Sequence, residues 1–171
     1  MYQKGEYVVY GTNGPCMVED VTKLKIPGCD AKRFYYVLRP VKTGKSVIYS
    51  PVDNEKVMIR PILSEEEATV LLQNIPQIAL LEVESEKVRE ETYKNVLHDS
   101  DLRRWIGLMK MLCRRRRDRL KQGRKITTVD ERYLKETEDL LGSELSLALG
   151  KDIETAKQML FEQLELLTTA G

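Results

Sequence analysis

The chain has 171 residues, which is enough for one ordinary domain or two small ones with a hydrophobic core. Its formal net charge is +1, and no apolar run is long enough to cross a membrane. The odd number and wide spacing of Cys16, Cys29 and Cys113 argue against a disulfide framework and a zinc site. We therefore expect a cytoplasmic protein with reduced thiols, no membrane association, and no metal or other cofactor.

Residues 7–60 have the pattern of short strands separated by turns. Turn signals stand at Gly11 to Gly14, at Pro27-Gly28 and at Lys42 to Lys45. The strands that this pattern predicts are 7–10, 16–26, 33–38, 46–50 and 57–60. Short strands at such regular spacing predict a small antiparallel β-barrel of the SH3 or Tudor type over residues 1–62. Barrels of this kind are usually binding modules.

From residue 63 onward the pattern is helical. Ser64-Glu65-Glu66-Glu67 is a capping box that predicts a helix reaching about Asn74. Further helices are predicted over 82–98, 100–122 and 128–149, and after Asp152. The chain is therefore predicted to be α+β, with an all-α helical bundle over residues 63–171 following the β-barrel.

The segment from Ser100 to Lys125 combines an amphipathic helix with eleven basic residues and two acidic ones. Ser100 is the predicted N-cap, and Trp105 lies on an apolar stripe that we expect to enter the core. One flank of this helix gathers cations, namely Arg103, Lys110, Arg114, Arg117 and Lys121. Two interpretations remain: a solvated face whose last turn favours the helix dipole, or a surface whose charge repulsion is relieved by a polyanion.

No catalytic group stands out. His98 is the sole histidine and lies at a predicted helix end, where a cation needs no catalytic explanation. Motifs for phosphate loops, metalloproteases and serine hydrolases are absent. We predict that the protein is not an enzyme and has no catalytic residues.

Several short strings, in their order and spacing, resemble the CarD family of bacterial regulators (CarD and CdnL), whose first domain also occurs in transcription-repair coupling factors. The strings are Tyr7-Val8-Val9-Tyr10, Phe34-Tyr35-Tyr36-Val37-Leu38, Pro51-Val52, Tyr93-Lys94 and Leu141-Gly142-Ser143-Glu144-Leu145. The resemblance implies a Tudor-like domain that binds the RNA polymerase β subunit. It also implies a helical domain that contacts promoter DNA at the upstream edge of the transcription bubble and alters open-complex stability.

The resemblance also assigns positions to the two contacts. The polymerase would meet Lys23, Leu24, Lys25 and Tyr49, where family members carry arginines. Relatives place a DNA-wedging tryptophan four residues before the Tyr-Lys pair, and Arg89 stands there in this chain. Our hypothesis is that DNA is contacted by Arg89, Lys94 and the cationic flank of the 100–122 helix.

The alternative is a non-enzymatic protein-interaction adaptor with a solvated basic helix and no DNA role. We expect a monomer associated with the nucleoid through RNA polymerase. A dimer formed by domain swapping at an exposed strand edge is the alternative oligomeric state.

Overall fold

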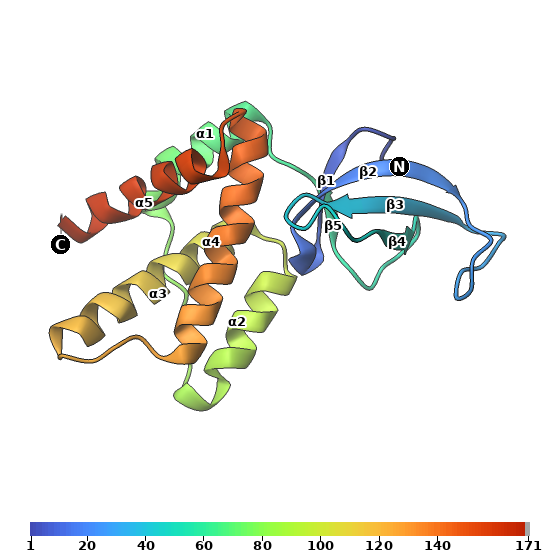
Figure 1. The fold of residues 1–171 in the computed structure, drawn as a ribbon. Helices are drawn as coiled ribbons and strands as arrows, with labels where there is room; N and C mark the ends of the chain where they lie inside the picture. Colours follow the sequence, from blue (N-terminus) through green and yellow to red (C-terminus); the bar gives the residue numbers. More distant parts are fainter. Residues whose placement is uncertain (170–171) are drawn as a thin grey trace. The chain divides into compact units, whose positions relative to one another are not determined.

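The computed structural model describes the backbone of residues 1–169 and the side chains of residues 1–164 (Figure 1). The chain divides into two compact units, Met1–Ile62 and Leu63–Gly171, the second ending outside the described residues. In the described part of the chain no helix is both long and apolar enough to cross a membrane.

The first unit is a five-stranded antiparallel sheet. Its strands are β1 (Tyr7–Tyr10), β2 (Pro15–Lys23), β3 (Phe34–Pro40), β4 (Ile48–Pro51) and β5 (Ile59–Pro61), and a 3-10 helix, η1 (Gly11–Asn13), follows β1. The spatial order is β4-β3-β2-β1-β5, so β4 and β5 are the end strands. The predicted β unit is confirmed. Closure into a barrel stays a prediction, because no ladder joins β4 to β5 among the described residues.

One face of this sheet carries the core of the first unit. Val8, Val18 and Leu38 are fully buried there and pack with Cys16 and Tyr36. On each strand these core residues are two positions apart, as the period of two requires, although Val9 and Tyr35 at the intervening positions are also buried. Burial raises the pKa of the Cys16 thiol to about 12, so this cysteine is an inert core residue.

The second unit is helical from its first element to the end of the described chain, which confirms the predicted α+β arrangement. The α-helices are α1 (Glu65–Asn74), α2 (Arg89–His98), α3 (Leu102–Lys121), α4 (Thr128–Leu149) and α5 (Ile153–Thr169). Two short 3-10 helices, η2 (Ile75–Gln77) and η3 (Glu86–Val88), lie between α1 and α2.

Local caps explain most helix boundaries. The Ser64 hydroxyl accepts a hydrogen bond from the Glu67 amide, as the capping box predicts. The predicted cap at Ser100 is wrong. Asp101 caps α3 by accepting from the Arg103 amide, whereas Ser100 has a φ of 54° in the left-handed region just beyond α2.

The helix predicted over 82–98 also begins later than expected, at Arg89. The chain before it is held against α3, where the Leu81 amide donates to the Gly107 carbonyl at 3.1 Å. Gly107 allows this approach, because a Cβ there would stand 2.7 Å from the Ala79 carbonyl oxygen. Residues 79–81 are thus fixed by a tertiary contact, and the chain reaches α2 through the 3-10 helix η3.

The first half of α3 forms the centre of the helical unit. Every residue from Trp105 to Leu112 is buried. Trp105 is fully enclosed, and its indole nitrogen donates to the Val96 carbonyl at 3.0 Å, so its predicted core position is confirmed.

Candidate functional site

The basic residues of α3 fall into a buried group and an exposed group. Because the helix is enclosed from Trp105 to Leu112, a cation within that stretch cannot reach solvent. Beyond Leu112 the helix alternates between exposed and half-buried positions, and Arg114, Arg116 and Lys121 are exposed. The continuous basic flank predicted from the helical wheel is therefore interrupted, and its charge is concentrated in the C-terminal half.

Lys110 is the position at which the flank breaks. Its side chain is buried, and its Nζ donates to the Ile75 carbonyl at 2.8 Å and to the Ile78 carbonyl. Burial lowers the pKa of this lysine. The DNA contact at Lys110 stays a prediction that this burial does not favour, because its ammonium already donates to two internal carbonyls.

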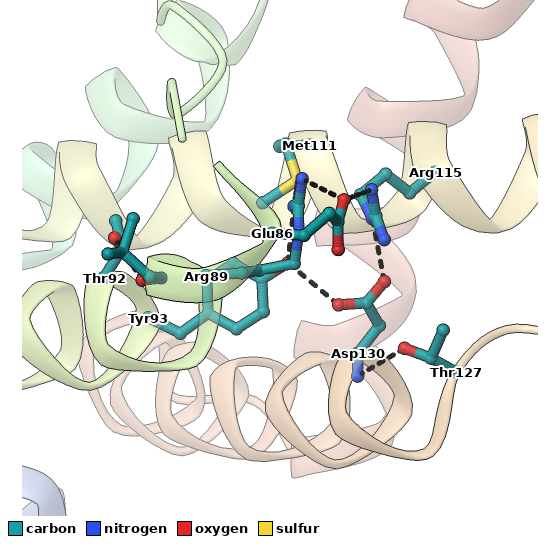
Figure 2. Close-up of polar contacts among 9 residues, drawn as sticks. Glu86, Arg89, Thr92, Tyr93, Met111, Arg115, Thr127 and Asp130 are labelled. Carbon is teal, nitrogen blue, oxygen red and sulfur yellow. Dashed lines mark hydrogen bonds and ion pairs between the residues drawn. The ribbon is translucent and has the colours of Figure 1, made fainter. Parts of the chain in front are cut away.

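Arg89 belongs to a closed ring of polar contacts that we call the polar ring: Glu86, Arg89, Tyr93, Arg115 and Asp130 (Figure 2). The Arg89 guanidinium donates to the Tyr93 hydroxyl at 2.9 Å and pairs with the Glu86 carboxylate at 3.0 Å. Only 16% of the Arg89 side chain is exposed. The structure thus turns Arg89 inward, against the prediction that it extends toward DNA.

Asp130 completes the ring from α4. Its carboxylate has no exposed surface and accepts from the Tyr93 hydroxyl and from Arg115 Nε, both at 2.8 Å. Arg115 also pairs with Glu86 at 3.3 Å, which closes the circuit between α2, α3 and α4. Both oxygens of the buried Asp130 carboxylate therefore accept a hydrogen bond. A buried charge is tolerated when it is paired and hydrogen-bonded in this way.

Four exposed cations of α3 make no ion pair with any described side chain: Arg103, Arg114, Arg116 and Lys121. Arg117 is half-buried and has only a 3.8 Å pair with the adjacent Asp118. Lys94 is exposed on α2, 3.9 Å from Glu90. We define the α3 basic surface as Arg114, Arg117 and Lys121, the predicted residues that the structure brings together on the exposed half of the helix.

The predicted polymerase contacts of the first unit lie on two faces of the sheet. Lys23, at the end of β2, pairs in register with Phe34, and Tyr49 on β4 pairs with Val37. Positions 34 and 37 are three apart on β3, so their side chains point to opposite faces. Leu24 is half-buried and Lys25 is exposed in the segment that follows β2.

Phe34 is a surface aromatic outside the predicted polymerase contacts. Its side chain is 49% exposed, and Lys23 Nζ lies 5.2 Å from its ring centroid. The sequence does indicate this position, because a hairpin centred on the Pro27-Gly28 turn places Lys23 opposite Phe34. Tyr49 is 45% exposed on the end strand β4.

The comparison with protein families decides the nature of the first unit. Residues 2–63 match the family model described as the CarD-like/TRCF RID domain. The first unit is a CarD-like RID domain. This agrees with the resemblance of the chain to the CarD family.

A CarD-like RID domain implies interaction with RNA polymerase and a role in transcription regulation, within a family of non-enzymatic regulators. The match ends where the helical unit begins, so it assigns no role to the polar ring or the α3 basic surface. A search of curated proteins found no match to the chain. Among the described residues no cluster of histidine, cysteine and acidic side chains could hold a metal ion.

Removing the Asp130 carboxylate is expected to destabilise the helical unit by about 2–4 kcal/mol, because Asp130→Ala leaves Arg115 Nε and the Tyr93 hydroxyl without their acceptor, although Arg115 keeps its pair with Glu86. Urea unfolding followed by Trp105 fluorescence measures this, since Trp105 is the only tryptophan and lies in the same unit. Glu131→Ala, at an exposed neighbouring position, should change stability by less than about 1 kcal/mol. Equal effects of the two substitutions would contradict the role of the ring.

The polar ring should also make stability depend on pH at the alkaline end. Burial, with the Asp130 hydrogen bond, raises the Tyr93 pKa to about 12, although Arg89 opposes the shift. An unfolded phenol titrates near pH 10, so the unfolded chain loses this proton first. Stability from Tyr93 is therefore fully present below pH 10 and is lost as the pH rises toward 12.

The measurement is the slope of unfolding free energy between pH 10 and 12 in the wild type and in Tyr93→Phe. We expect a shallower slope in the variant, by up to about 2–3 kcal/mol over the interval. The Cys16 thiol also has a raised pKa, but both proteins contain this thiol, so it does not affect the difference between their slopes. Identical slopes would show that the Tyr93 proton is not held by the fold.

Proposed function

We propose that this protein is a bacterial transcription regulator that binds the RNA polymerase β subunit through its first unit. In this proposal the helical unit holds the backbone of promoter DNA near the upstream edge of the transcription bubble and alters open-complex stability. The match of residues 2–63 to the CarD-like RID domain is the observation that carries the proposal. The protein would act as a cytoplasmic monomer associated with the nucleoid through the polymerase.

The polymerase contact is assigned to Tyr49, Lys23, Leu24 and Lys25. Exposed aromatic side chains are frequent anchors of protein interfaces because they bury a large area at low entropic cost. Tyr49 meets this description on an end strand, and Lys23 is positioned over Phe34. A tyrosine and lysines form no bidentate pair with a carboxylate, so apolar burial should dominate this contact.

Tyr49→Ala in the full chain should weaken binding to purified RNA polymerase β subunit by about tenfold or more, since a truncated anchor costs about 2 kcal/mol. Biolayer interferometry with immobilised β subunit measures the affinity. Met58→Ala is the matched control, because Met58 is exposed on the same unit but lies outside β4 and β5. A loss of affinity in the control alone would place the contact elsewhere on the domain.

The DNA contact is assigned to the α3 basic surface, with Arg103 and Lys94 as further cations. Arg114, Arg117 and Lys121 span roughly 10 Å along the helix at about 1.5 Å per residue, a suitable length for adjacent phosphates. Lys110 is excluded because it is buried, and Arg89 because it is part of the polar ring. No apolar wedge is available at position 89, so we expect binding to depend on charge and to have weak sequence preference.

Arg114→Glu combined with Arg117→Glu should lower the salt dependence of promoter binding by the polymerase complex. Each lost phosphate contact reduces the slope of log K against log salt by about 1. Fluorescence anisotropy of a labelled promoter at several salt concentrations gives the slope, and open-complex lifetime on the same promoter gives the regulatory effect.

The control pair is Lys135→Glu with Lys151→Glu, which changes the net charge equally at exposed positions on and just after α4. Its slope should stay close to that of the wild type. An unchanged slope in the Arg114 and Arg117 variant, with polymerase binding intact, would favour an adaptor without a DNA role.

A further inference from the structure

The C-terminal half of α3 and the helix α5 enclose a groove of about 500 Å³. Both helices extend from α4 on the same side of the helical unit (Figure 1). The apolar wall of the groove includes Leu120, Phe161 and Leu164. Leu120 is 61% exposed, so part of this wall is open to solvent.

Cations stand at the edge of the same groove. Arg116, Arg117 and Lys121 line it together with the apolar residues. Arg116 has no ion pair with any described side chain, although it follows the apolar stripe of α3. Arg116 is not one of the cations of the predicted basic flank.

Arg117 provides a second observation at this site. Its Nε is enclosed and has no hydrogen-bond acceptor among the described atoms, and the nearest paired carboxylate oxygen, on Asp118, is 3.8 Å away. Enclosed donors are normally satisfied, because an unmade hydrogen bond costs about 1–3 kcal/mol. An acceptor brought into the groove by a ligand would satisfy this one.

We propose that the groove between α3 and α5 binds a short acidic segment of a partner protein that carries one large apolar side chain. The apolar side chain would sit between Leu120 and Phe161, and flanking carboxylates would pair with Arg116, Arg117 and Lys121. This combination of an apolar floor with a cationic edge distinguishes the groove from a phosphate surface. A nucleic-acid backbone would gain nothing from Leu120, Phe161 or Leu164.

The groove shares Arg117 and Lys121 with the α3 basic surface, but the two sites differ at Arg114, Arg116 and Leu120. On the helical wheel Arg116 and Leu120 lie on the apolar side of α3, whereas Arg114 lies nearly opposite to Arg116. Arg114 does not line the groove. Substitutions at Leu120 and at Arg114 therefore test the peptide site and the DNA surface independently, and this inference does not rest on the proposed function.

The probe is a fluorescein-labelled heptapeptide of sequence Glu-Asp-Ser-Phe-Glu-Asp-Ser, which has four acids and one large apolar side chain, titrated into the full-length protein and followed by anisotropy. In parallel, ¹⁵N-labelled protein should show peptide-dependent shifts at Cys113, Leu120 and Phe161. Leu120→Gln keeps the charges and the helix but removes the exposed apolar contact, and it should weaken binding about tenfold. Arg116→Gln should weaken it by a similar factor, and Arg114→Glu should leave it unchanged.

Two altered peptides test the chemistry of recognition. Replacement of Phe by Ser, or of all four acids by their amides, should each reduce affinity about tenfold or more. Equal binding of the amide peptide would overturn the acidic specificity. If Arg114→Glu abolished peptide binding and Leu120→Gln left it unchanged, the assignment of the peptide site to this groove would be overturned.

Competing occupants give different results. Displacement of the peptide by a duplex oligonucleotide, without any effect of Leu120→Gln, would assign the groove to DNA and overturn the proposal. Tighter binding of laurate than of the peptide would assign it to anionic amphiphiles. Self-association in analytical ultracentrifugation, abolished by Leu120→Gln, would assign it to a second copy of the chain. Failure of the salt-slope test for Arg114 and Arg117 leaves the peptide experiment unaffected.

Discussion

The helical unit depends on the enclosure of the first half of α3. Trp105 to Leu112 are buried on every side of the helix, and Lys110 Nζ binds the carbonyls of Ile75 and Ile78, so even a cation is recruited into the packing. The second half of the same helix extends beyond this enclosure, and its arginines therefore face solvent or the groove beside α5. One element thus serves as the core of the unit and as its main charged surface.

The arginines of this unit serve two physically different purposes. Arg89 and Arg115 surround Asp130 and Glu86, where they stabilise the junction of three helices through paired and hydrogen-bonded charge. Arg114 and Lys121 are exposed and make no ion pair with a described carboxylate, so their positive charge is available to an anionic partner. Burial decides between these purposes, since a charge taken out of water requires a partner and an exposed one does not.

In the CarD-like RID domain the register of the sheet imposes a comparable division. Tyr36 and Leu38 belong to the buried face of β3, while Phe34 continues the same alternation beyond the core and becomes exposed. Tyr49 and Lys23 lie on different faces of the sheet. A partner that uses both would therefore have to approach along an edge or an end of the sheet rather than against one flat face.

Local interactions explain what the sequence by itself determined. Turn residues, periodicity and caps such as Ser64 act over a few positions, so the five strands, the order of helices and the α+β class could be derived directly. Only the tertiary structure decided which cationic side chains are exposed to solvent and which are buried. The helical wheel gives the direction of the Lys110 and Arg89 side chains, but their exposure depends on which elements pack against them. The Tyr93–Asp130 contact in the polar ring joins residues 37 positions apart in the sequence. Contacts at that separation leave no periodic trace in the chain, because they are selected by packing between helices rather than within one.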